Sequence, residues 1–383
     1  MLNIKFFNMH PIQMVDLKGQ YQKIKTEVNN AIQNVIDSTA FIQGSEVKDF
    51  QKELEQYLGV KHVIPCANGT DALQIALMAL DLKPDDEIIT TGFTFVATVE
   101  VVELLKLKPV IVDVEPDSFT ISPEAVEKAI TPRTRAIVPV HLFGQCANME
   151  KLQDIADRHN LFIIEDAAQA LGTDYIYRNG ARKKAGTISN IGTTSFFPSK
   201  NLGAYGDGGA LFTQDNALAE KIRSIANHGM QVRYYYDRIG VNSRLDTLQA
   251  GILRVKLKHL DEYNQAREKA ASFYDAAFKR HPAIRIPARM PYSTHIFHQY
   301  TIQISRDGRE ELRKSLAESG IPAMIYYPVP LHLQKAYAHL GYREGDSPVT
   351  EKLCKTVISL PMHTELDEEQ LRYITDKLTG FLS

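Results

Sequence analysis

The sequence predicts an α/β fold, with a mostly parallel seven-stranded sheet sandwiched by helices in a large domain and a smaller C-terminal α+β domain. Between residues 60 and 215, short apolar runs alternate with segments of helical spacing, which is the pattern of βαβ units. Most of these runs are apolar at consecutive positions, as expected of strands buried on both faces of a parallel sheet. The regular runs are 63–66, 87–91, 110–114, 136–140 and 162–165, and two less regular runs, 192–197 and 209–213, flank a glycine-rich loop.

The second half of the chain predicts the domain boundary. A long helical pattern from about residue 246 to 281 ends at a cluster of prolines, which stop helices. We therefore expect a large domain over residues 1–255, of which the first dozen residues read as an extension, and a small domain over 256–383. The small domain should hold a strand at 298–305, a helix at 309–319, a strand at 323–327 and terminal helices after Ser347 and Asp367.

The composition favours a globular protein whose binding sites are local. The 383 residues carry a formal net charge of -2 and the pI is about 6.6, so the broad basic field of a nucleic-acid-binding protein is missing. Cys66, Cys146 and Cys354 are odd in number and widely spaced, which predicts neither a disulfide framework nor a zinc site and favours a reducing cytoplasm. No run approaches the roughly 18 apolar residues of a membrane span, and no signal-peptide core is evident. We expect a cytoplasmic protein that binds no membrane.

A first candidate site lies at 68–71, where Asn-Gly-Thr-Asp follows a strand and opens a helical stretch. Helix N-termini carry unpaired N–H groups and a partial positive charge, so they bind phosphate. Gly69 would let the backbone approach the anion, and Thr70 offers a hydroxyl. An ordinary helix-capping turn is the alternative for such a short motif.

A second candidate site lies at the carboxyl end of the strand at 162–165, where open α/β sheets bind ligands. A buried carboxylate at Asp166 could pair with a pyridine nitrogen and keep it protonated, which makes the ring an electron sink. Gln169 is placed to donate a hydrogen bond to a ring substituent. The alternative is that Glu165 or Asp166 only caps a following helix.

A third candidate site is Lys200, which stands between an apolar strand and a glycine-rich turn. Loss of water favours the neutral amine of a lysine, which can condense with an aldehyde. Ser195 would supply a further phosphate contact, and a solvated loop lysine is the alternative. Nucleotide-binding loops and a hydrolase elbow are excluded, because the chain has no G-x-G-x-x-G opening a helix, no Walker spacing and no G-x-S-x-G. His141 and Cys146 are interpreted as structural, and we expect no metal.

Six segments, in their order and spacing, resemble the DegT/DnrJ/EryC1/StrS sugar aminotransferases over almost the whole chain. They are NGTDAL at 68–73, GFTFVAT at 92–98, EDAAQA at 165–170, TSFFPSKNLG at 194–203, GDGGA at 206–210 and GVNSRLDTLQA at 240–250. The resemblance implies a fold type I transaminase that depends on pyridoxal 5'-phosphate (PLP), binds it in the large domain and works as a homodimer with active sites at the interface.

The resemblance also implies roles for individual residues. Lys200 would be the catalytic lysine that forms a Schiff base with PLP, Asp166 the partner of the pyridine nitrogen and Gln169 the neighbour of the phenolic oxygen. The other implied cofactor positions are a ring-stacking Phe95, a phosphate cradle of Gly69, Thr70 and Ser195, and Asn242 contributed by the second subunit. For Phe95, plain core packing is the alternative.

The segments 326–334, 144–149 and 240–250 are most similar to members that aminate position 3 of nucleotide-linked sugars. This similarity implies a UDP-2-acetamido-3-oxo-glucuronate-type substrate, L-glutamate as donor with 2-oxoglutarate as product, and a place in cell-surface polysaccharide (LPS, O-antigen) biosynthesis. The expected substrate contacts are Tyr327, His332 and Arg244, whose guanidinium matches a carboxylate or phosphate but would equally suit an interface ion pair. Tyr326 stands where close members of that branch carry histidine, and a dTDP-linked keto-deoxyhexose is the alternative substrate.

Three functions of other classes compete with transamination. In PLP-dependent sugar dehydratases of this scaffold a histidine stands where the lysine would be, so Lys200 argues against that reaction. A flavin- or nicotinamide-linked oxidoreductase would need a dinucleotide fingerprint that the sequence lacks. A non-catalytic regulatory protein on the same fold would be expected to lose Lys200 or Asp166, and both are present.

Overall fold

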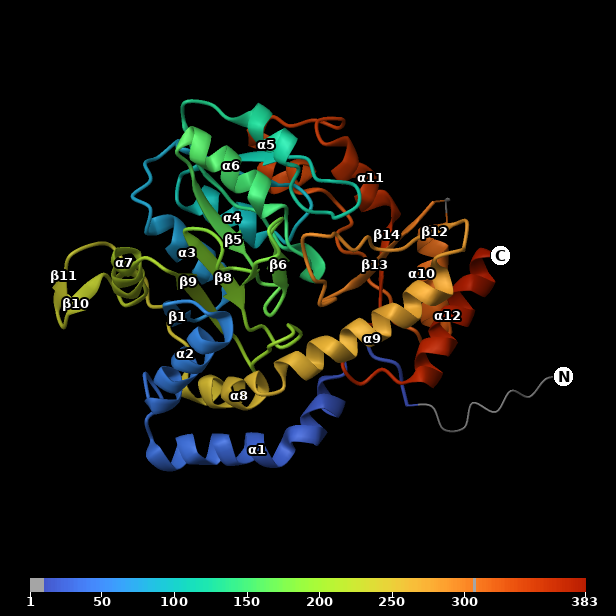
Figure 1. Ribbon diagram of the computed structural model, residues 1–383, viewed down its shortest axis with the longest axis horizontal. Helices are drawn as coiled ribbons and strands as arrows, with labels where there is room; N and C mark the ends of the chain where they lie inside the picture. Colours follow the sequence, from blue (N-terminus) through green and yellow to red (C-terminus); the bar gives the residue numbers. More distant parts are fainter. Residues whose placement is uncertain (1–9, 306–307) are drawn as a thin grey trace.

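The computed structural model describes residues 10–305 and 308–383, and it is built around a seven-stranded sheet (Figure 1). The strand order is β1-β9-β8-β5-β4-β2-β3. The strands are β1 (His62–Cys66), β2 (Glu87–Thr91), β3 (Lys108–Val112), β4 (Thr134–Ile137), β5 (Phe162–Asp166), β8 (Ile191–Ser195) and β9 (Gly209–Thr213). Only β9 runs antiparallel to its neighbours, β8 and β1, so the mostly parallel α/β sheet is confirmed, including the pair that flanks the glycine-rich loop.

Helices cover both faces of this sheet because successive strand residues point to opposite sides. Ile88 packs with α3, α4 and α7 on one face, whereas Ile89 packs with α6 on the other. The covering helices are α3 (Gly69–Met78), α4 (Ala97–Leu104), α5 (Pro123–Ala129), α6 (Met149–His159) and α7 (Asn216–Ala226). Strands buried on both faces explain why the sequence shows continuous apolar runs there.

Two N-terminal helices were not predicted. They are α1 (Leu17–Ser38) and α2 (Ser45–Leu58), and both pack on α8 (Thr247–Leu257). The expected extension over the first dozen residues lies largely outside the described part of the chain, which starts at His10. The long helix predicted over 246–281 is in fact two helices, because α8 ends at Leu257 and α9 (Leu260–Phe278) begins after a break. The domain boundary predicted after residue 255 falls inside α8 and stays a prediction.

The C-terminal part forms a second core around a three-stranded antiparallel sheet, at the far end of α9 (Figure 1). Its elements are β12 (Ile284–Arg285), β13 (Tyr300–Ile304), β14 (Val357–Leu360), α10 (Arg309–Glu318), α11 (Pro348–Thr356) and α12 (Glu368–Leu382). The predicted strand at 298–305 and the predicted helices are confirmed. The strand predicted at 323–327 is wrong, because this segment makes one bridge, from Met324 to Ser359, and residues 325–327 pack into a neighbouring cluster.

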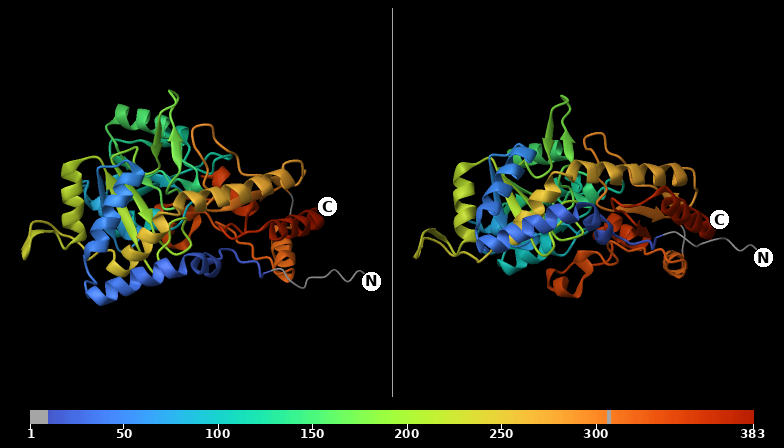
Figure 2. Two further views of the ribbon diagram at one scale, coloured as in Figure 1. Left: turned by 60° about the horizontal axis from the view of Figure 1, so that its bottom comes forward. Right: turned by 90° about the horizontal axis from the view of Figure 1, so that it is seen from below.

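Short elements complete the described chain. Two hairpins project from the body (Figure 2), one formed by β6 (Asp174–Ile176) and β7 (Arg182–Lys184), the other by β10 (Met230–Val232) and β11 (Tyr235–Tyr236). The 3-10 helices are η1 (Leu142–Gly144), η2 (Leu331–Leu333) and η3 (Lys335–Leu340). Among the helices of residues 10–305 and 308–383, none is long and apolar enough to span a bilayer.

Candidate active site

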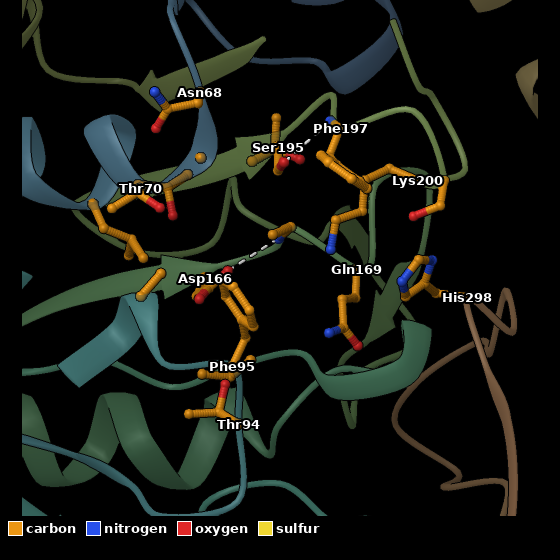
Figure 3. A pocket seen from close by; sticks show the side chains of 18 of the residues that line it. Asn68, Thr70, Thr94, Phe95, Asp166, Gln169, Ser195, Phe197, Lys200 and His298 are labelled. Carbon is orange, nitrogen blue, oxygen red and sulfur yellow. Dashed lines mark hydrogen bonds between the residues drawn. The ribbon is translucent and has the colours of Figure 1, made fainter. Parts of the chain in front are cut away.

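A cavity of about 630 Å³ lies where several strands of the large sheet end (Figure 3). Asp166 is the last residue of β5 and Ser195 the last of β8, so both reach this cavity from the carboxyl ends of parallel strands. That edge is where open α/β sheets bind ligands. Of the residues predicted from the sequence, the cavity brings together Gly69, Thr70, Phe95, Asp166, Gln169, Ser195, Lys200 and Tyr327.

The start of α3 forms one end of the cavity. Asn68 caps this helix by accepting a hydrogen bond from the backbone N–H of Asp71 at 2.8 Å. A Cβ atom at Gly69 would lie 2.7 Å from the Cβ of Ser195, so only glycine permits this close approach. The hydroxyl side chains of Thr70 and Ser195 lie at this end (Figure 3). The helix start therefore combines a capped turn with the features of an anion site.

Asp166 is a buried carboxylate that has no ion-pair partner among residues 10–305 and 308–383. It is 6% exposed, and it accepts hydrogen bonds from the Thr98 hydroxyl at 3.0 Å and from the Ala168 N–H at 3.1 Å. No helix begins after it, because residues 167–172 form turns, so the capping alternative does not apply. Burial raises the pKa of Asp166, although those hydrogen bonds and the charge of Lys200 oppose the shift. A cationic ligand group would relieve this cost of burial.

The neighbouring Glu165 has a structural role. Its side chain is fully buried and accepts hydrogen bonds from His141 Nε2 at 2.9 Å and from the backbone N–H groups of Gly186, Ile188 and Ser189. His141 Nδ1 accepts from Ala147, so Nε2 is the nitrogen that donates to Glu165. The geometry thus agrees with interpreting His141 as structural. The side chains of these two adjacent acids point to opposite sides of the strand, and only that of Asp166 lines the cavity.

Lys200 lies in the turn that follows β8, and its side chain extends into the cavity (Figure 3). Its backbone N–H donates to the carbonyl oxygen of Phe197 at 2.8 Å. Loss of water in the cavity lowers the pKa of Lys200 to about 8, although the charge of Asp166 works in the opposite direction. The solvated-loop alternative therefore does not describe this lysine, whose neutral, nucleophilic form is accessible near physiological pH.

This lowered pKa can be measured directly on the cofactor-free protein. We expect the methylated amine of Lys200 to titrate near pH 8 in a carbon-13 NMR experiment after reductive methylation, against the ordinary value of 10.5. Because the shift disfavours the ammonium form, the neutral fraction should grow as the pH rises through 8. A Lys200→Ala variant identifies the resonance, and a midpoint near 10.5 would contradict the desolvation argument.

Gln169, Tyr327 and Phe95 form the remaining predicted part of the wall. The Gln169 side chain accepts a hydrogen bond from Phe143 N–H at 2.7 Å and donates one to the Tyr327 hydroxyl at 3.3 Å, so its amide is oriented from both sides. Phe95 is 56% exposed although it is a large aromatic residue, because it faces the cavity. Core packing does not account for Phe95, and an open aromatic face is available to a planar ligand.

Three predicted residues lie elsewhere in the protomer. The backbone of Asn242 forms an isolated antiparallel bridge with that of Asn227. Arg244 lines a second cavity of about 680 Å³. His332 is 1% exposed, and its Nε2 lies 3.1 Å from a carboxylate oxygen of Glu351. His332 does not line the active-site cavity of the described protomer, and its contact with substrate stays a prediction.

Other residues of the cavity were missed by the sequence analysis. His298 and Gln299 line it, as do Phe197 and Tyr326. His298 is 5% exposed, and its Nδ1 has no hydrogen-bond partner among the described residues. The only available signal was its position at the start of the predicted strand 298–305, and nothing in that pattern indicates which end of the strand faces a cavity.

Comparisons with known proteins agree with this arrangement. Residues 22–379 match the DegT/DnrJ/EryC1/StrS aminotransferase family. The pleiotropic regulatory protein of Geobacillus stearothermophilus is 46% identical over 372 residues, which cover 97% of this chain and 98% of that protein. The UDP-2-acetamido-2-deoxy-3-oxo-D-glucuronate aminotransferase of Pseudomonas aeruginosa is 45% identical over 369 residues, covering 96% and 100%. The crystal structure of S. venezuelae DesV in complex with a ketimine intermediate matches with a TM-score of 0.93 at 39% identity, covering 97% and 99% of the two chains.

Proposed function

Because the chain belongs to the DegT/DnrJ/EryC1/StrS aminotransferase family and is a PLP-dependent sugar aminotransferase, we propose that it transfers an amino group from L-glutamate to C3 of a UDP-2-acetamido-3-oxo-glucuronate-type sugar. The observation that carries the proposal is one cavity holding a lysine of lowered pKa and a buried carboxylate that has no ion-pair partner in the described part of the chain. The P. aeruginosa relative, by its name, acts on such a sugar, which supports the choice of substrate. Cell-surface polysaccharide biosynthesis is the proposed setting.

The residues of the cavity fit PLP by their chemistry. The Gly69 backbone, Thr70 and Ser195 would hold the phosphate, because they combine a helix N-terminus with two hydroxyls. Asp166 would pair with the ring nitrogen, whose positive charge removes the cost of burying an unpaired carboxylate. Phe95 would stack on the ring.

Two further residues complete the proposed cofactor site. Gln169 would contact the phenolic oxygen through its oriented amide. Lys200 would anchor the cofactor covalently, since a neutral amine condenses with an aldehyde. The substrate contact expected of Tyr327 is supported by its position on the cavity wall beside Gln169.

The proposed mechanism assigns each proton and charge to a group of this chain. When bound, PLP supplies a carbonyl carbon that exchanges amines and a ring that accepts an electron pair. The Nζ of Lys200 takes a proton from a substrate carbon and returns one, which requires a pKa near the working pH such as its value of about 8. Asp166, fixed by Thr98 and Ala168, keeps negative charge opposite the ring nitrogen throughout. The same residues serve both the donor and the acceptor sugar, in a ping-pong cycle.

We propose that the active unit is a homodimer in which Asn242 and Arg244 of one subunit complete the site of the other. Within the described chain, Lys200 is the only lysine or arginine among the residues lining the cavity, whereas both substrates are anions. Arg244, Arg223 and Lys48 gather instead at the second cavity. A symmetric dimer that faces this cavity toward the partner's active site would supply the missing positive charge.

Co-expression of two inactive variants tests this arrangement. Lys200→Ala and Asn242→Ala homodimers should each lack activity, but a mixed dimer would carry one site with both changes and one intact site. Random pairing should then restore about a quarter of wild-type activity. Absence of restoration in mixed dimers isolated by two different tags would contradict shared sites.

One assay tests the proposed reaction. The purified protein loaded with PLP is incubated with L-glutamate and a panel of UDP- and dTDP-linked keto sugars, and the aminated product is detected by mass spectrometry. We expect amination of the UDP-linked 3-oxo-glucuronate. Selective amination of a dTDP-linked keto-deoxyhexose would replace the substrate assignment and keep the transaminase.

A non-catalytic regulatory role is the competing function, since the G. stearothermophilus relative is named a regulatory protein. A regulatory protein has no need for a desolvated lysine beside a buried carboxylate, because both cost stability. Their presence in one cavity favours catalysis. Failure of every sugar and of glutamate itself to react in the assay would favour the regulatory role.

A further inference from the structure

His298 is an imidazole side chain on the wall of the active-site cavity that the proposed chemistry does not use. Its ring is 5% exposed and lines the cavity, and Nδ1 has no partner among residues 10–305 and 308–383. Figure 3 shows it on the side of Lys200 and Gln169, whereas Thr70 and Ser195 lie at the other end. The substrate must approach the Lys200 side, because that amine is the reacting group of the chain.

Hydrogen bonds hold the backbone of His298 at the cavity wall. Its N–H donates to the Phe143 carbonyl oxygen at 2.9 Å, and its carbonyl oxygen accepts from the buried Arg267 at 3.3 Å. Arg267 also donates to the carbonyl oxygens of Phe297 and Met362, so three separate backbone groups converge on one guanidinium. The backbone therefore places the ring at the cavity wall, and burying its Nδ1 without a partner among the described residues is costly.

The chemistry of this ring selects one of the two substrates. Burial and the charges of Lys200 and Arg267 hold the pKa of His298 well below its ordinary value, so the imidazole stays neutral. A neutral imidazole offers one donor and one acceptor. A sugar hydroxyl can bond whichever ring nitrogen faces it, because it both donates and accepts, whereas a carboxylate can bond only an N–H nitrogen and gains no counter-charge from a neutral ring.

We propose that His298 is a specificity-determining residue that hydrogen-bonds a hydroxyl of the acceptor sugar and not a carboxylate of the amino donor. The inference rests on the proposed function, because it assumes a sugar and an amino acid that use the cavity in turn. It predicts that the two half-reactions depend on His298 to different degrees. A merely structural role would affect both alike.

The test measures the two half-reactions separately on the PLP-loaded protein, by the visible absorption of the cofactor. In His298→Phe, kcat/KM for the UDP-linked 3-oxo-glucuronate should fall by roughly 10- to 100-fold, and much less for L-glutamate. His298→Gln keeps a donor and an acceptor and should recover part of the loss. The matched control is His295→Gln, since His295 is buried in the same segment but does not line this cavity.

Each outcome has a distinct meaning. An equal loss in both half-reactions of His298→Phe, or the same unequal loss in His295→Gln, would overturn the role of His298 while the transaminase stands. A larger loss with L-glutamate would assign the ring to the donor and also overturn the inference. If the wild-type protein aminates no sugar of the panel, the proposed function fails first, and this result is recognised before any variant is compared.

Discussion

Replacing Lys200 by alanine should lower transamination by roughly 10⁴-fold or more, because one substitution removes both the nucleophile and the proton-transfer group. The lysine lies in a solvent-poor cavity that lowers its pKa to about 8, and no other lysine lines that cavity in the described chain. The measurement is single-turnover formation of 2-oxoglutarate from L-glutamate on protein reconstituted with PLP. Borohydride reduction should label the peptide that contains TSFFPSK in the wild-type protein and should leave the corresponding peptide of the alanine variant unlabelled.

Lys200→Arg is the matched variant, because arginine keeps the positive charge but remains protonated and cannot condense with an aldehyde. We expect it to be as inactive as the alanine variant while its circular dichroism spectrum matches the wild type. Appreciable turnover in either variant, or a borohydride label on a different peptide of the wild-type protein, would remove Lys200 from the reaction.

Replacing Asp166 by asparagine should lower kcat by about 10²–10³-fold, the cost of removing one pre-oriented electrostatic group from a transition state. Asparagine has nearly the same shape, and its single side-chain oxygen can still accept from the Ala168 N–H while its amide donates to the Thr98 hydroxyl oxygen, but it carries no negative charge. The ring nitrogen of the cofactor would then lose its proton and its capacity as an electron sink. Steady-state kinetics at saturating PLP separates this effect from weaker cofactor binding.

Thr98→Val is the control for this substitution, because it removes a hydrogen bond to the carboxylate and leaves the charge in place. Its loss of activity should be much smaller than that of Asp166→Asn. Equal losses in the two variants would indicate that orientation, not charge, is the contribution of Asp166. Wild-type activity in Asp166→Asn would contradict the proposed role.

Local sequence patterns sufficed for the residues that follow directly on a strand. Asp166 ends β5 and Lys200 follows β8, and the carboxyl ends of parallel strands meet at one edge, so two weak motifs far apart in the chain could be expected in one site. The same reasoning holds for Gly69 and Thr70, whose helix start is visible in the sequence. These predictions depend only on strand periodicity and helix ends, which are properties of neighbouring residues.

Patterns of this kind failed where pairing with distant segments decides the conformation. The apolar residues 323–327 suit a strand, but β14 takes the place beside β13 and leaves Tyr326 and Tyr327 to line the cavity. The helices α1 and α2 were missed although each is amphipathic, and a single helix was predicted where α8 and α9 separate. Tertiary packing overrides local preference at such positions.

The chain's own order of residues therefore predicted the α/β architecture, because strand burial is local and repeats along the chain, and the order and spacing of its motifs assigned the expected roles of Lys200 and Asp166 through the family resemblance. Only the tertiary structure showed three further features. His298 lines the cavity, His332 contacts Glu351, and Arg244 lines a different cavity from Lys200. Each of these depends on which segments meet in the folded chain, and such contacts carry no periodic signal in the sequence.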